Sequence, residues 1–368
     1  DGEVAVFDLA REQNLLAGCT FRRFGTNAII VQGGAGHGIL GCDLATLGAG
    51  GIRMAGGEVK TLTPSRHFVE NCHVWDFSRV DRAYAPAVQL EGVGGRIAHN
   101  LFHDSPHHAM RIEGYEHAIE WNEIHSVVYE SDDQAGIDLW GNPTYRGIVI
   151  RNNFWHHIGS GHDVAGQAGI RLDDFISDVL MTGNVFYRAA GGRFGAIQIH
   201  GGKNNIAENN LFIDCKYALS FSPWGEKRWQ ERLPGRVEQA VKASGMDITS
   251  PPFSTRYPSL ATMAEDADRN FVWRNAAVDC GAFAIRDSGV NQWLNNVAFA
   301  ADPGFVDAKK RDFQLQADSP VYRRFGFRPI PFGQIGLYQD AYRATWPVQH
   351  SITPHFIDES PSAAGPTK

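Results

Sequence analysis

The sequence predicts an all-β protein with the fold of a right-handed parallel β-helix of about ten rungs, and three observations support this prediction. First, one short phrase recurs: an apolar stretch, an Asn or Cys at a turn, a second apolar stretch and a polar loop. Second, the turn residues follow one another at intervals of 21 to 31 residues, with one gap of 65, as in a solenoid with loops of variable length. Third, the segments after the loops alternate apolar and polar residues, the period of a half-buried strand. The turn residues are Cys19, Cys42, Cys72, Asn100, Asn122, Asn153, Asn184, Asn210, Asn275 and Asn296.

The turn residues suit the corners of such a coil. An Asn side chain can hydrogen-bond locally or tolerate a left-handed backbone, and stacked Asn side chains can pair along the axis. Three of the five cysteines occupy corners, where we expect packing rather than disulfide bonding, and an odd number leaves at least one thiol unpaired. The Leu-rich signature of the rival leucine-rich repeat solenoid is absent.

The alternating segments define which side chains face outward. In the segment AGIRLDD, Ile170 and Leu172 are expected to point into the core, so that Arg171 and Asp173 point outward. Applied to all six aligned segments, this register predicts two outward rows of side chains that can hydrogen-bond. The first row is Gln89, Arg111, Asp138, Arg171, Gln198 and Ser220, and the second is Glu91, Glu113, Trp140, Asp173, His200 and Ser222. Rows of this composition are typical of a groove that binds a hydroxyl-rich ligand.

Three segments complete the expected organisation, with residues 1–338 as a single β-helix domain and 339–368 as a C-terminal extension. The gap holds an insertion, 222–265, with a charged, helix-forming stretch that Pro234 is expected to break. The insertion could wall a cleft or simply decorate the surface, and its exposed aromatic residues, Trp224 among them, favour the cleft. Residues 302–326 read as a final strand pair that caps the open end of the coil.

Composition limits the function classes. With 43% hydrophobic and 20% charged residues among 368, the chain can build one large core. A net charge of −7 disfavours nucleic acid, and the absence of a long apolar run indicates no membrane span. The start DGEVAVFDLA suggests a processed or trimmed chain, and we expect a secreted or periplasmic protein.

The supply of carboxylates is the main indication of catalysis. Asp132 and Asp133 precede one outward strand, Asp138 lies in it, and Asp173 and Asp174 end the next. Carboxylates placed this close raise one another's pKa, so that one can remain protonated and act as an acid while another acts as a base. The competing interpretation is a surface ladder of ion pairs along the first row, which would contribute only about 0–1 kcal/mol per pair.

Histidines are the second unusual supply. His103, His125 and His156 each follow a corner Asn by three residues, so they should stack along the coil in a structural role. Side chains of a parallel ladder do not converge on one point, and no CxxC or HExxH spacing occurs, so we expect no metal and no cofactor. His107 and His200 lie beside the outward rows and could bind sugar hydroxyls or assist proton transfer.

Three long stretches of the chain resemble one known family. They are ENCHVWDFSRVDRAYAPAVQLEGVGGRIAHNLFHDSPHHAMRIEGYEHAIEWNEIHSVVYESDDQAGIDLWG (70–141), GIRLDDFISDVLMTGNVFY (169–187) and GGKNNIAENNLFIDC (201–215), and they look like the β-helix glycosidases typified by glycoside hydrolase family 141. The closing segments DPGFVDAKKRDFQL and RPIPFGQIGLY are also similar to those of the family. The resemblance implies a right-handed parallel β-helix that hydrolyses a plant or host glycan, as an α-L-fucosidase or xylanase does.

The resemblance also implies a catalytic pair of aspartates. By motif they fall on ESDD, at Asp133, and on LDD, at Asp174 or Asp173. The chain departs from the family after the first motif, since DQAGIDLW places Asp138 and Trp140 in the sugar-facing register, which admits Asp138 as a substitute catalytic carboxylate.

We therefore expect a glycoside hydrolase. The catalytic candidates are Asp133, Asp138, Asp173 and Asp174, and the substrate-binding candidates are Asp132, His107, Arg111, Glu113, Trp140, Arg171, His200 and Trp224. Two alternatives remain: a polysaccharide lyase that uses Arg111 and Arg171 against a uronic acid, and a non-catalytic glycan-binding β-helix.

Overall fold

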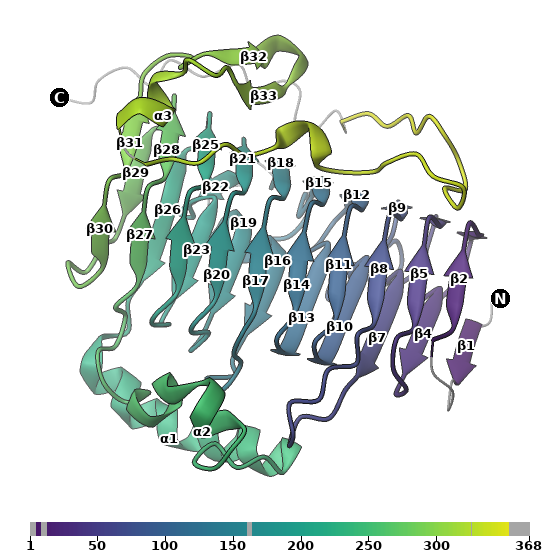
Figure 1. Ribbon diagram of the computed structural model, residues 1–368, viewed down its shortest axis with the longest axis horizontal. Coiled ribbons are helices and arrows are strands. Elements are labelled where there is room, and N and C mark those ends of the chain that lie inside the picture. Colours follow the sequence, from purple (N-terminus) through teal and green to yellow (C-terminus); the bar gives the residue numbers. More distant parts are fainter. Residues whose placement is uncertain (1–4, 9–12, 160–163, 325, 353–368) are drawn as a thin grey trace.

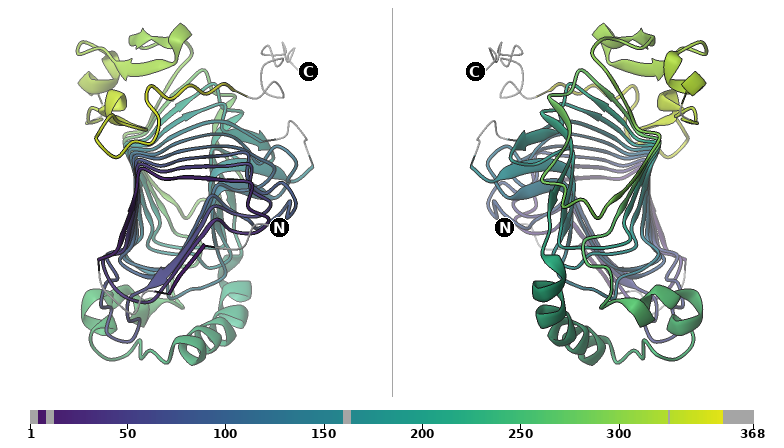
Figure 2. Two further views of the ribbon diagram at one scale, coloured as in Figure 1. Left: turned by 90° about the vertical axis from the view of Figure 1, so that its right-hand side faces the viewer. Right: turned by 90° about the vertical axis from the view of Figure 1, so that its left-hand side faces the viewer.

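The computed structural model describes residues 5–8, 13–159, 164–324 and 326–352, and it confirms the predicted parallel β-helix. Three long parallel sheets, which we name A, B and C, form the three faces of the coil (Figures 1 and 2). Each turn of the chain contributes one strand to sheet A, then one to B and one to C. No helix in the described part of the chain has the length and apolar character needed to cross a bilayer.

The strands of each sheet follow chain order. Sheet A contains β1 (Ala5–Asp8), β4 (Ile29–Gln32), β7 (Ile52–Gly56), β10 (Val88–Val93), β13 (Met110–Tyr115), β16 (Gln134–Trp140), β19 (Gly166–Asp173), β23 (Ile197–His200), β26 (Tyr217–Ser222) and β29 (Ala282–Ile285), with β22 (Ala190–Gly192) antiparallel to β19. Sheet B contains β2 (Leu15–Ala17), β5 (Gly38–Leu40), β8 (Phe68–Glu70), β11 (Arg96–Ala98), β14 (Ala118–Glu120), β17 (Val149–Arg151), β20 (Leu180–Thr182), β24 (Ile206–Glu208), β27 (Phe271–Trp273) and β30 (Gln292–Leu294). Sheet C contains β3 (Thr20–Arg22), β6 (Asp43–Ala45), β9 (His73–Trp75), β12 (Leu101–Ser105), β15 (Glu123–Val127), β18 (Phe154–Ile158), β21 (Val185–Tyr187), β25 (Leu211–Ile213), β28 (Ala276–Val278) and β31 (Val297–Phe299).

A ladder of buried Asn side chains forms the corner between sheets B and C. The amide nitrogen of Asn122 donates to Oδ1 of Asn153 at 2.9 Å, and Asn153 donates in turn to Asn184 at 3.0 Å, a pattern that continues to Asn296. The left-handed backbone at this corner belongs to the preceding residue, for example Trp121 with φ 61°. Each Asn therefore stabilises the corner through the hydrogen bonds of its side chain. The described cysteines are all free thiols.

The insertion forms helix α1 (Gly225–Ser244), helix α2 (Phe253–Arg256) and the 3₁₀ helix η1 (Pro258–Thr262), which lie along one side of the coil (Figure 1). The expectation that Pro234 breaks the first helix is wrong, because α1 continues through it. Pro234 and Gly235 are exposed, while Trp229, Leu233 and Ala240 are buried against the coil. Burial of that apolar face outweighs the backbone hydrogen bond that Pro removes.

The predicted final strand pair exists, as the antiparallel hairpin β32 (Phe305–Asp307) and β33 (Asp312–Leu315), but its expected place is wrong. Phe305, Phe313 and Leu315 pack in one apolar cluster with Val185 and Ala276 of sheet C. The hairpin thus covers the outer face of that sheet instead of the end of the coil, because the last rungs of sheet C present apolar side chains outward. Three short helices follow or join it: η2 (Ala308–Lys310), α3 (Pro320–Arg324) and η3 (Phe332–Gln334).

Candidate functional site

The outward rows of sheet A lie in the register that the sequence predicts. Arg111 pairs with Asp138, Asp138 with Arg171, and Arg171 with Gln198 on successive strands. In the second row Trp140 pairs with Asp173, and Asp173 pairs with His200 on β23. We call the outward side chains of β13, β16, β19 and β23 the sheet A site.

Arg171 lies at the centre of the sheet A site and joins two of the predicted aspartates. Its Nη2 atom is 3.0 Å from Oδ1 of Asp133 and 3.0 Å from Oδ2 of Asp173. Nη1 donates to the Asp133 carbonyl at 2.5 Å, and the guanidinium lies 5.7 Å from the centre of the Phe194 ring. Arg171 is only 7% exposed and Asp173 is buried as well, so their ion pair is shielded from water and is stronger than a pair on an open surface, whereas the Asp133 side chain remains exposed.

Asp138 occupies the most secluded position of the four catalytic candidates. It is 4% exposed, and its Oδ1 atom has no hydrogen-bond partner among the described residues. Burial raises the pKa of Asp138 to about 7, although Arg171 and Arg111 on either side act in the opposite direction. The side chain is therefore substantially protonated at neutral pH, unlike an ordinary exposed aspartate.

Asp173, Asp174 and His200 form a second group at the end of β19. Nδ1 of His200 lies 2.8 Å from Oδ1 of Asp173 and 3.5 Å from Oδ1 of Asp174. Asp174 has a left-handed backbone, with φ 42°, and burial next to Asp173 raises its pKa. One ligand atom from each residue lies within 4.8 Å of the others, so the group could hold a divalent cation, but Asp173 already pairs with Arg171.

Arg111 and Glu113 extend the site toward earlier rungs. The two donors of Arg111, Nε and Nη2, lie 3.1 and 2.7 Å from Oε1 of Glu113. His107 is buried beside them, where burial lowers its pKa to about 4, and its Nδ1 lies 2.8 Å from Nδ1 of His108. His107 is thus a neutral hydrogen-bonding group at neutral pH.

Asp132 lies at the edge of the sheet A site and holds a loop. Its carboxylate accepts hydrogen bonds from the backbone of Ala165 at 2.7 Å and Gly166 at 2.6 Å. It also accepts one from Nε2 of Gln167 at 2.8 Å. These contacts hold Ala165 and the start of β19 against Asp132 and so help to fix Asp133 beside Arg171.

The two tryptophans connect the sheet A site to the insertion. Trp140 is 45% exposed, and the Arg236 guanidinium of α1 lies 5.4 Å from its ring centre. Trp224 is half-buried 5.9 Å from the His200 ring, with Arg228 of α1 stacked at 3.7 Å. Helix α1 therefore borders the site.

Two contributors were not among the predicted residues. Tyr84, 63% exposed, lies with its ring 4.7 Å from that of His107, and Arg236 approaches from the insertion. Tyr84 also lines a cavity of about 310 Å³ together with Arg53 and Gln89 of the first row. The aromatic residue next to an aligned strand was a usable signal for Tyr84, whereas the sequence carries no pattern that places Arg236.

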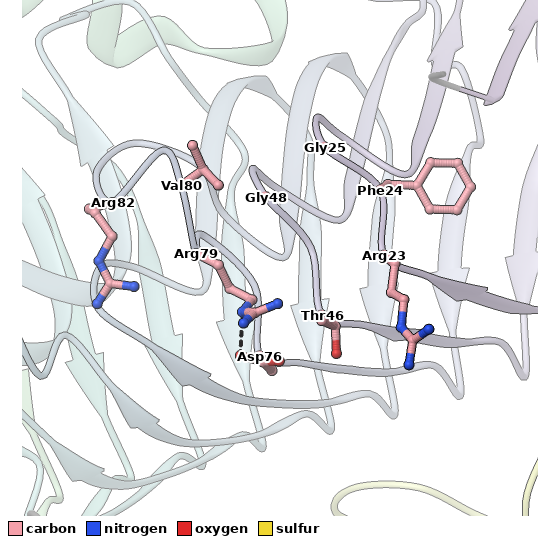
Figure 3. A pocket seen from close by; sticks show the side chains of 9 residues that line it. All are labelled: Arg23, Phe24, Gly25, Thr46, Gly48, Asp76, Arg79, Val80 and Arg82. Atoms are coloured by element: carbon pink, nitrogen blue, oxygen red, sulfur yellow. Dashed lines mark ion pairs between the residues drawn. The ribbon is translucent and has the colours of Figure 1, made fainter. Parts of the chain in front are cut away.

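A larger cavity of about 530 Å³ lies away from the aspartates, at the corner between sheets C and A (Figure 3). Arg23, Arg79 and Arg82 line it, and Arg79 forms an ion pair with Asp76 at 3.3 Å. Its loop 79–86 also contributes to the cavity beside Tyr84, so the two cavities adjoin along the early rungs of sheet A.

Comparisons with known proteins agree with the fold. A family model for the right-handed β-helix region matches residues 86–228, which include all four catalytic candidates. A search among curated proteins gave no match. A solved glycoside hydrolase is similar over 84% of this chain and 40% of its own, at 12% identity and a TM-score of 0.35. An alginate lyase solved with the oligosaccharide G6 is similar over 83% of this chain and 60% of its own, at 13% identity and a TM-score of 0.36. The chain thus spans less than two thirds of either structure, and likenesses this distant carry no argument about activity.

Proposed function

We propose that the protein is a glycoside hydrolase that uses Asp138 as general acid and Asp173 as general base on a polysaccharide or oligosaccharide. The observation that carries the proposal is the contrast between these two neighbours. Asp138 is secluded, with a pKa of about 7, whereas Asp173 is held between the guanidinium of Arg171 and His200. Two carboxyl groups whose environments differ in this way are what acid–base cleavage of a glycosidic bond requires.

The register sets the spacing of the pair. Asp173 is two residues beyond the partner of Asp138 on the adjacent strand, so their backbones are separated by roughly 8 Å, given a step of ~6.7 Å along the strand and ~4.8 Å between rungs. An inverting mechanism, in which Asp138 protonates the leaving oxygen while Asp173 activates a water, requires the two carboxyl groups themselves to lie roughly 6.5–9.5 Å apart, and the backbone spacing allows this. Trp140 and Tyr84 offer exposed rings for sugar faces, and Asp133, Asp174 and Glu113 offer acceptors for hydroxyl groups.

The test is a screen against aryl glycosides and plant polysaccharides, with products resolved by chromatography. On any substrate that is turned over, Asp138→Asn and Asp173→Asn should each lower kcat by roughly 10²–10⁴-fold. Asp214→Asn is the matched control, because Asp214 pairs with Arg188 at 2.6 Å on another face of the coil. Full activity in Asp138→Asn, or no turnover anywhere in the panel, would contradict the proposal.

The basic residues along sheet A favour one second candidate, a polysaccharide lyase acting on a uronic acid. Arg53, Arg111 and Arg171 lie on alternate strands of sheet A, namely β7, β13 and β19, and Arg82 lines the adjoining cavity. In a lyase an arginine would neutralise the uronate carboxylate while a base removes the neighbouring proton. An unsaturated product that absorbs in the ultraviolet, formed from alginate or pectin, would favour this candidate over hydrolysis.

A further inference from the structure

A column of histidines runs along the outer face of sheet C, away from the sheet A site. The predicted stacking of His103, His125 and His156 is confirmed: successive ring centres are 4.7 Å apart. His73 extends the column on β9, with its ring centre 5.0 Å from that of His103. Stacking alone would not gather their nitrogen atoms around one point.

Two further residues bring donor atoms together at the middle of the column. Glu123 lies two residues before His125 on β15 and therefore on the same face, with Oε1 3.1 Å from Nε2 of His156. Nδ1 of His350, from the C-terminal part of the chain, lies 2.8 Å from Nε2 of His125. The donor atoms of Glu123, His125 and His156 all lie within 4.8 Å of one another.

The other ring nitrogens have partners that orient the two sheet histidines. Nδ1 of His125 lies 3.0 Å from the hydroxyl of Ser126, and Nδ1 of His156 lies 2.9 Å from Nδ1 of His157. Their Nε2 atoms are thereby directed toward Glu123 and His350. A partner on the second ring nitrogen fixes the orientation of the ring, as it does in histidines that bind a metal.

The segment that supplies His350 is a strap, residues 336–352, which runs along the coil toward its N-terminal rungs and then turns back (Figure 1). The Gly336 amide donates to the Trp121 carbonyl at 2.8 Å, and farther along the strap Arg343 forms a buried ion pair with Asp43. The return of the strap then brings His350 back to the rung of His125. No sequence spacing could reveal this, because 225 residues separate the two histidines.

We propose that Glu123, His125, His156 and His350 form a binding site for a divalent transition metal, with Zn²⁺ as the best match, that fastens the strap to sheet C. Zn²⁺ takes four imidazole and carboxylate ligands at ~2.0–2.2 Å in a tetrahedral arrangement, which requires donor atoms roughly 3.3 Å apart. The distances of 2.8 and 3.1 Å between donor atoms need only small side-chain movements to reach it. A complete set of four protein ligands indicates a structural rather than a catalytic ion.

The test uses the full chain without a histidine tag, stripped with a chelator. Calorimetric titration with Zn²⁺ should show one saturable site per chain, and Co²⁺ should give the intense visible absorption of tetrahedral coordination. The cobalt spectrum should lack a thiolate charge-transfer band. Its absence would show that the ion is not bound by the cysteines at the corner between sheets B and C. Absence of saturable binding, or an octahedral cobalt spectrum, would overturn the proposal.

Substitutions of the proposed ligands test whether the bound ion holds the strap against sheet C. His350→Ala and Glu123→Gln should each weaken Zn²⁺ binding by at least 10-fold, and Zn²⁺ should slow protease cleavage of the strap in the unaltered chain but not in these two variants. His99→Gln is the matched control, because His99 also contacts the strap, with its ring 5.2 Å from that of Tyr338, but lies outside the cluster. Equal loss of Zn²⁺ binding in His99→Gln, or unchanged affinity in His350→Ala, would contradict the assignment.

Discussion

Asp138 shows how a single residue acquires its properties from the rung above and the rung below. Its neighbours in the row are both arginines, yet burial dominates and raises the pKa of its carboxyl group to about 7. Among the described residues, one side-chain oxygen of Asp138 is buried without a hydrogen-bond partner. The burial of Asp138 therefore affects the properties of the sheet A site as much as the charges around it do.

The raised pKa of Asp138 makes a prediction about stability. The native state holds the proton up to about pH 7, whereas the unfolded chain loses it near pH 4, so this residue costs the fold progressively more as pH rises between those values. Replacement by Asn removes the titration. The difference in unfolding free energy between Asp138→Asn and the unaltered protein should therefore shift in favour of the variant by roughly 3–4 kcal/mol between pH 4 and pH 8.

Denaturant unfolding at the two pH values measures this shift. Asp214→Asn, which replaces a carboxylate in a partly exposed ion pair, serves as the control and should show a much smaller change. A constant difference for Asp138→Asn across the pH range would show that its carboxyl group titrates normally in the folded protein.

For these residues, prediction and structure agree best where the position follows from the sequence repeat. The aligned strands fixed the partners of Asp138 and Arg171, because a parallel register follows from period two and a constant corner. The same alignment could not foresee that Arg171 joins Asp133 to Asp173, since Asp133 lies in a turn with φ 56°. Loop conformation, unlike strand register, is set by contacts outside the repeat.

The Asn ladder is the element that holds successive rungs at a constant corner. Asn153 accepts from the backbone and side-chain nitrogens of Asn122, each at 2.9 Å. It donates to the Ile119 carbonyl and to Asn184, each at 3.0 Å. All of these groups are buried, so each one must find its partner within the protein.

Asn153→Ala should lower the free energy of unfolding by roughly 3 kcal/mol, because several buried donors and acceptors lose a partner at once. Asn296→Ala, at the half-buried end of the ladder, should cost about 1 kcal/mol, since water can replace the missing group there. Chemical denaturation of both variants provides the comparison. Similar costs at the two positions would mean that the ladder contributes little beyond local packing.

Elements outside the repeat were predicted less well, because their structure depends on contacts that the repeat does not encode. The helical insertion was expected from its composition, but Pro234 within α1 was not, because packing of Trp229 and Leu233 against the coil decides that helix. The hairpin β32–β33 was expected, but not its seat on sheet C. Both outcomes depend on surfaces that form only after the rungs have stacked.

At the scale of the whole molecule, the strap joins the two ends of the sequence. Arg343 and Asp43 form an ion pair that is almost fully buried, and Arg343 also donates to the Asn71 carbonyl at 2.7 Å. Asn71 in turn exchanges two hydrogen bonds with the backbone of Tyr338. Contacts that span about 270 to 300 residues are thus superimposed on a fold made otherwise of neighbouring rungs.

Asp43→Ala should be strongly destabilising, by roughly 3–5 kcal/mol, because it leaves Arg343 as an unpaired buried cation. Asp307→Asn, which removes an exposed pair with Lys310, should have a much smaller effect. Thermal unfolding combined with limited proteolysis of residues 336–352 would measure both effects. Intact protease resistance of the strap in Asp43→Ala would show that the ion pair is not its anchor.

The strap also affects the order in which the rungs of the coil unfold. In a linear array of repeats, terminal rungs open first, because each one is supported by a single neighbour. Here the rung of Asp43 cannot open without detaching residues near the opposite end of the sequence. Under a pulling force or near its melting temperature, such a coil should open from its unstrapped end, where Trp293 and Leu294 of β30 are exposed, and keep its first rungs closed longest.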